Sequence, residues 1–151
     1  MDRNKWLIAG GILSAAAAIL HVATIVGGPA WYRFFGAGED MARAAEQGSL
    51  TPALVTAAIA GVLLAWALYA FSGAGIIRRL PLLRTALVLI SAIYLVRAFV
   101  LLPLLILRPD RADTFAIVSS LIVLAYGLAY AIGTWSAWPQ LSEPRGKDIR
   151  A

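Results

Sequence analysis

The stretch PALVTAAIAGVLLAWALYAFSGAGII, residues 52–77, contains 26 residues and no charged side chain. A helix needs about 20 apolar residues to cross the hydrocarbon core of a bilayer, whereas apolar runs of about 10–14 residues are more typical of helices buried in soluble proteins. The stretch therefore predicts a transmembrane helix. Thr51 and Pro52 suit the start of a helix, because Thr is a good cap and Pro is favoured in the first turn.

Three further apolar runs have the same character, and they cover residues 6–27, about 85–107 and about 114–138. The connections at 77–84 and 108–113 are short, so that neighbouring helices are expected to be antiparallel. We expect an all-α membrane protein with four transmembrane helices in an antiparallel bundle. The bundle would form a single domain over residues 1–138, followed by a polar cytoplasmic tail over 139–151.

The composition leads to the same fold class. The chain is 61% apolar and 14% charged, with a mean hydropathy of +0.80, whereas soluble domains are about 45–50% apolar and about 25% charged. A soluble domain of 151 residues has too little interior to bury this apolar surface. With no cysteine and one histidine, a zinc or haem site would need an unusual ligand set. We expect membrane lipid as a partner, and no metal, cofactor or nucleic acid.

The basic residues predict the orientation, because cytoplasmic loops carry an excess of Lys and Arg. One side of the predicted bundle has four arginines diluted by five acids. The other side has eight basic residues, namely Arg3, Lys5, Arg78, Arg79, Arg84, Arg145, Lys147 and Arg150. This bias predicts a multi-pass protein of the inner (plasma) membrane with both termini in the cytoplasm.

A secretory signal peptide is the alternative interpretation of the first apolar run. Residues 1–5 are basic, and small residues follow at 28–30. The run is 22 residues long, however, and the apolar region of a signal peptide is typically about 7–15 residues. We therefore interpret it as an uncleaved transmembrane helix.

The longest predicted connection covers residues 28–51 and would lie on the outer side. Its first half is rich in aromatic residues, which suit the headgroup layer. Glu39–Gln47 lies between Gly38 and Gly48, with acids where a helix dipole favours them and a glycine where helices often end. We expect a short interfacial helix here. It would either cover the outer mouth of the bundle or serve as a solvated connector.

Arg97 is the residue that most directly suggests a functional site. It lies ten residues before Leu107, or about 15 Å from the outer end of its span at 1.5 Å per residue. An arginine at this depth costs at least about 2.5–3.5 kcal/mol, and such residues usually face the interior with a partner. Because no acid lies within the four predicted spans, the partner would be an outer-loop carboxylate (Glu39, Asp40 or Glu46), polar protein groups, water or an anionic ligand.

Other polar side chains are predicted at a similar depth. His21 follows a face of small residues on the first span, which suits a hydrogen bond between helices or a contact with a ligand. Tyr94 lies one turn before Arg97, and Tyr126 lies on the fourth span. We expect Arg97, His21, Tyr94 and Tyr126, with Glu39 and Asp40, to line an outward-facing polar cavity.

Three functional hypotheses remain open from the sequence. The favoured one is a non-enzymatic protein whose cavity binds a small anionic or amphipathic ligand, or which acts as an accessory subunit of a membrane complex. The second is an enzyme acting on a lipid or isoprenoid, with His21, Glu39 and Glu46 as candidate catalytic residues. The third is a purely structural role in which helix faces form a homo-oligomer.

Overall fold

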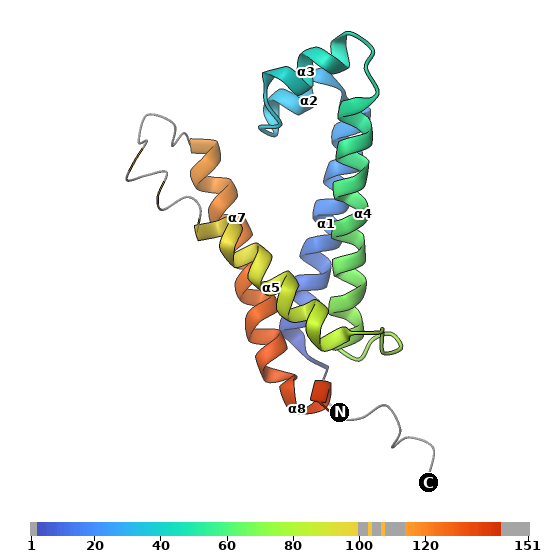
Figure 1. Ribbon diagram of the computed structural model, residues 1–151, viewed down its shortest axis with the longest axis vertical. Helices are drawn as coiled ribbons and strands as arrows, with labels where there is room; N and C mark the ends of the chain where they lie inside the picture. The colour runs from blue at the N-terminus through green and yellow to red at the C-terminus, as the bar shows by residue number, and fades with distance from the viewer. Residues whose placement is uncertain (1–2, 100–102, 104–106, 108–113, 143–151) are drawn as a thin grey trace. The chain divides into compact units, whose positions relative to one another are not determined.

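The computed structural model describes residues 3–99, 103, 107 and 114–142 (Figure 1). The regular secondary structure of these residues is entirely helical. The helices are α1 (Lys5–Gly27), α2 (Pro29–Phe34), α3 (Glu39–Glu46), α4 (Thr51–Gly73), α5 (Leu83–Phe99), α7 (Thr114–Ser136) and α8 (Trp138–Ser142).

Three of these helices, α1, α4 and α7, are long and apolar enough to cross a membrane. Each has 23 residues and is therefore about 35 Å long, which exceeds the hydrocarbon thickness of about 30 Å. Their positions confirm three of the predicted apolar helices. The chain is an all-helical protein whose long apolar helices are compatible with a membrane location.

The fourth predicted span, about 85–107, is described only in part. Helix α5, with 17 residues, covers its first part up to Phe99. Apart from Pro103 and Leu107, the remainder of this span lies outside the described residues. The count of four spans and the antiparallel bundle therefore stay predictions.

The chain divides into two compact units. The first unit contains residues 1–11 and 68–151, and the second contains residues 12–67. In the first unit, α5 packs along α7, and α8 contacts both helices (Figure 1). Its most completely buried side chains are those of Leu7, Leu87 and Tyr130, which therefore form the centre of its core.

Glycines allow the helices of the first unit to approach each other closely. A Cβ atom on Gly133 of α7 would lie 2.7 Å from Cγ of Leu7, and one on Gly10 of α1 would lie 2.9 Å from the ring of Tyr130. Side chains other than hydrogen do not fit at such distances. Small residues at helix contacts are the usual device for packing apolar helices in membranes.

Asn4 connects the first turn of α1 to the end of α7. Its Oδ1 accepts hydrogen bonds from the backbone N–H groups of Trp6 and Leu7, both at 3.1 Å. Its Nδ2 donates to the carbonyl of Gly133 at 2.8 Å and to Oγ of Ser136 at 3.0 Å. The same side chain therefore caps one helix and binds it to another.

In the second unit, α2 and α3 pack against each other (Figure 1). The helix predicted over Glu39–Gln47 is confirmed as α3. The helix ends at Glu46 with Gln47 as its C-cap. Gly48 follows with φ +76°, and the N–H of Ser49 donates to the carbonyl of Ala44. This is a Schellman ending, for which glycine is favoured because it adopts positive φ without strain.

The end of α7 differs from the sequence-based expectation. The fourth span was predicted to continue to Trp138 and to be followed by a polar tail from Pro139. Instead α7 ends at Ser136, and a second short helix, α8, begins at Trp138. Pro139 occupies the first turn of α8, where its missing N–H is not needed, so that the proline begins one helix rather than only ending another.

Candidate functional site

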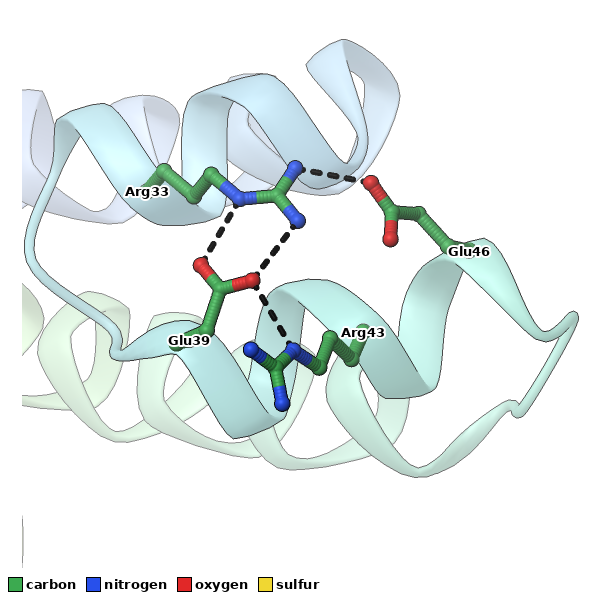
Figure 2. Close-up of polar contacts among 4 residues, drawn as sticks. All are labelled: Arg33, Glu39, Arg43 and Glu46. Atoms are coloured by element: carbon green, nitrogen blue, oxygen red, sulfur yellow. Dashed lines mark hydrogen bonds and ion pairs between the residues drawn. The ribbon is translucent and has the colours of Figure 1, made fainter.

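The charged residues of α2 and α3 form a compact network in the second unit (Figure 2). Arg33 of α2 donates from Nε and Nη2 to the two carboxylate oxygens of Glu39, at 2.9 and 3.0 Å. Its Nη1 donates to Glu46 at 2.8 Å. One guanidinium therefore binds both ends of α3, with the two-pronged geometry that arginine makes with carboxylates.

A second arginine joins the network from α3 itself. Nε of Arg43 donates to Oε1 of Glu39 at 3.1 Å, an i, i+4 pair in the order that stabilises a helix. The hydrogen bonds from Arg33, followed by that from Arg43, lower the pKa of Glu39 to about 2. The hydrogen bond from Arg33 lowers the pKa of Glu46, and both glutamates raise the pKa of Arg33. Both carboxylates are therefore ionised at neutral pH.

All four charged groups of this network are accessible to water. The side chains of Arg33 and Glu39 are 39% and 48% exposed. Ion pairs at this exposure contribute little to stability, because water and salt screen them. The network orients α2 on α3, and the apolar support comes from Tyr32 and Ala42, which are buried.

In the first unit, three tyrosines lie together between α5 and α7. The rings of Tyr94 and Tyr126 meet edge to face with centroids 5.4 Å apart, and Tyr94 and Tyr130 are 5.5 Å apart. The structure thus brings together two of the predicted site residues, Tyr94 and Tyr126. Tyr130, which the sequence analysis did not single out, is fully buried beside them.

Arg97 follows this cluster by one turn of α5, and its side chain is exposed. Among the described residues, no carboxylate forms an ion pair with Arg97. Glu39 and Glu46 are bound by Arg33 within the second unit. The prediction that an outer-loop acid pairs with Arg97 therefore stays a prediction, and its most suitable acids already have arginine partners.

His21 of α1 is half-buried, and its Nδ1 lies 2.7 Å from the carbonyl oxygen of Ala17. Because a carbonyl can only accept, Nδ1 carries the proton, and the neutral ring has its lone pair on Nε2. This bond lies within α1, so the predicted hydrogen bond between helices and the predicted ligand contact both stay predictions. Asp40 is exposed on the first turn of α3, where its charge suits the helix dipole.

The predicted cavity would bring residues of both units together. His21, Glu39 and Asp40 belong to the second unit, whereas Tyr94, Arg97 and Tyr126 belong to the first. The positions of these residues are described within each unit separately. A cavity that both units line stays a prediction. In the described ranges, no group of three or more His, Asp or Glu residues could hold a metal ion.

Arg33, which the sequence analysis did not single out, is the centre of the network that joins α2 and α3. A weak signal was present, because two acids follow it at six and 13 residues, at the two ends of one short helix.

Comparisons with protein-family models, with curated proteins and with solved structures found no match to this chain.

Proposed function

We propose that this chain is a non-enzymatic, multi-pass protein of the inner (plasma) membrane that binds a small anionic or amphipathic ligand on its outer side. Four antiparallel spans would place both termini in the cytoplasm and residues 28–51 outside. The basic residues on the proposed inner side support this orientation. The same ligand site would suit an accessory subunit of a membrane complex.

The observation that carries this proposal is the arrangement of Arg97 and Tyr94 on α5. The exposed Arg97 follows Tyr94 by one helical turn, and Tyr94 contacts the half-buried ring of Tyr126. Arginine binds carboxylates and phosphates, and the accessible part of the Tyr126 ring offers an apolar surface. A ligand with an anionic head and a short apolar part would match both features.

The network of Arg33, Glu39, Arg43 and Glu46 favours a ligand as the partner of Arg97 over an acid of the chain itself. Glu39 makes three hydrogen bonds to two arginines, and Glu46 is bound to Arg33. Drawing either acid to Arg97 would require breaking these bonds. An anion from outside the chain would neutralise Arg97 without this cost.

The same bonds count against the enzymatic alternative. A reaction using His21 needs a nearby group that holds or receives its proton, and the candidates were Glu39 and Glu46. Both are bound by arginines, which lower the pKa of each carboxylate and make it a weaker proton acceptor. His21 itself is bonded to the carbonyl of Ala17.

The proposal is tested with the full chain in phosphatidylcholine nanodiscs, labelled at alanine methyl groups. Hexyl phosphate supplies an anionic head and a short apolar chain, and hexanol is the neutral control. The methyl of Ala98, next to Arg97, reports binding locally by NMR. We expect saturable shifts with hexyl phosphate and none with hexanol.

The Arg97→Gln variant should weaken this binding about tenfold, because a charge-assisted hydrogen bond contributes roughly 1.5–3 kcal/mol. Arg78→Gln, which removes an exposed arginine from the loop before α5, is the matched control and should bind as the wild type does. Equal binding by the wild type and Arg97→Gln would contradict the proposal.

A further inference from the structure

A cavity of about 390 Å³ lies in the first unit, where α1 begins and α4 ends. Its polar lining comes from Arg3, Asn4, Ser72, Arg79 and Gln140. All of these residues belong to one compact unit. The volume falls in the range of about 300–1,000 Å³ that is typical of ligand pockets.

Hydrogen bonds within the chain hold one wall of this cavity in place. Oγ of Ser72 accepts from the N–H of Leu80 at 2.9 Å and donates to the carbonyl of Arg78 at 3.0 Å. This buried serine fixes the loop after α4. Asn4, which also lines the cavity, is held by its bonds to Gly133 and Ser136. The pocket is therefore formed before any ligand arrives.

Arg79 is held at the cavity by backbone groups of α8. Its Nη2 donates to the carbonyl of Leu141, and its Nη1 lies 3.5 Å from the carbonyl of Gln140. These carbonyl oxygens orient the guanidinium at the cavity. Arg3, which is exposed, lines the same cavity. Two arginines thus contribute to one pocket.

The described segments around the cavity are rich in basic residues. The segments 3–11, 68–84 and 138–142, which surround it, contain no Asp or Glu. They contain five basic residues, namely Arg3, Lys5, Arg78, Arg79 and Arg84. Asp2 and Glu143 lie outside the described residues. A concave surface with this excess of positive charge attracts anions.

Apolar side chains share the lining with the arginines. Ile77, Leu83 and Leu141 face the same cavity. Beside it, the guanidinium of Arg84 stacks over the ring of Trp138 at 3.9 Å, and tryptophan is enriched at the boundary between headgroups and hydrocarbon. A pocket with both characters suits a ligand that carries an anionic group next to apolar chains.

We propose that this cavity binds the phosphodiester headgroup of an anionic phospholipid, with Arg3 and Arg79 as the phosphate ligands. Basic pockets between membrane helices bind such headgroups on the cytoplasmic side, where the proposed topology places α8. The site shares with the proposed function only the membrane location. It uses none of the residues of the outer ligand site.

The test uses the full chain in a neutral detergent, with alanine methyl labels. Ala74 lines the cavity, and its methyl group reports binding there by NMR. Dihexanoyl phosphatidylglycerol is the anionic lipid probe, dihexanoyl phosphatidylcholine is the zwitterionic control, and inorganic phosphate is the soluble-anion arm. We expect saturable shifts at Ala74 with phosphatidylglycerol, at least about tenfold weaker binding of phosphatidylcholine, and no saturation with inorganic phosphate.

Three variants distinguish specific binding in the cavity from a general attraction of the lipid to positive charge. Arg3→Gln and Arg79→Gln should each weaken phosphatidylglycerol binding about tenfold. Arg78→Gln removes the same charge from the neighbouring position, which does not line the cavity, and should change binding less than twofold. Since Arg79 also holds α8, Arg3→Gln keeps the test valid if Arg79→Gln fails to fold.

Two results would overturn the proposal. Equal effects of Arg3→Gln and Arg78→Gln would mean that only the overall charge matters. Saturation by inorganic phosphate, with no preference for the lipid, would assign the cavity to a soluble anion. Arg97→Gln should leave the Ala74 response unchanged, so that this site and the outer site succeed or fail separately.

Discussion

Asn4 and Gly133 are 129 positions apart in the sequence and are joined by a hydrogen bond of 2.8 Å from the asparagine amide to the glycine carbonyl. The bond connects the beginning of α1 to the last turns of α7. It forms where Leu7 packs against Gly133, so that a polar and an apolar contact secure the same junction. The first unit therefore depends on residues from both ends of the chain.

Replacing Asn4 tests this junction. Asn4→Ala removes a helix cap, worth about 1 kcal/mol, and hydrogen bonds worth about 1 kcal/mol more. We expect a loss of about 2 kcal/mol in the free energy of unfolding, measured in detergent. Asn4→Ser should lose about half as much, because serine still caps α1 but does not reach Gly133. Equal stability of Asn4→Ala and the wild type would contradict the described junction.

The close packing at Gly133 gives a second prediction. Gly133→Ala would place a methyl group 2.9 Å from the backbone nitrogen of Leu7, and the backbone moves aside less readily than a side chain. Overpacking of this kind costs about 1–3 kcal/mol. Gly61→Ala is the control, since a Cβ atom there meets nothing within 4 Å. It should leave the melting temperature unchanged or raised, as alanine favours a helix by about 1 kcal/mol.

The carboxylate of Glu39 should titrate far below the usual range. Its pKa is lowered to about 2, first by the hydrogen bond from Arg33. A lowered pKa in the folded state means that the ionised form stabilises the α2–α3 pair above the unfolded pKa of about 4.3. This stabilisation is lost as the pH falls from about 4 to 2. Carboxyl NMR should give a midpoint near 2, and Arg33→Gln should move it upward. A midpoint near 4 in the wild type would show that the network does not form.

A double-mutant cycle identifies the partner of Glu39. Glu39→Gln should be strongly non-additive with Arg33→Gln, because the two residues share two hydrogen bonds. The effect of Glu39→Gln on the stability of α3 should be additive with that of Arg97→Leu. Hydrogen exchange in α3 provides the measurement, and Asp40→Asn is the matched control with little expected effect. Coupling of Glu39 to Arg97 instead would favour the outer-loop acid as the partner of Arg97.

Much of the helical pattern could be predicted from the sequence for clear physical reasons. Long apolar runs predicted α1, α4 and α7 to within a few residues. The acids and glycines around residues 39–48 predicted α3 and its approximate end. These features are local, because each depends on residues within a few turns of one another.

The features that the sequence did not predict are contacts over longer distances. Arg33 reaches Glu39 and Glu46 only because the chain reverses between α2 and α3 at Gly36 and Gly38, which have φ +70° and +98°. Helix α8 was not predicted, because Pro139 was interpreted only as the residue that ends the fourth span. The cavity at Arg3 and Arg79 combines residues 3–4, 72–83 and 140–141, which no local pattern reveals.

The proposed topology has four transmembrane spans and places both termini in the cytoplasm. The chain has no cysteine, so that single cysteines introduced by Ala37→Cys, Arg78→Cys, Asp110→Cys and Ala151→Cys can be labelled individually with a membrane-impermeant thiol reagent on intact spheroplasts. We predict that positions 37 and 110 are labelled directly, and that positions 78 and 151 are labelled only after the membrane is permeabilised. Protection of position 110 together with direct labelling of position 151 would show that only three helices cross, and would contradict the account.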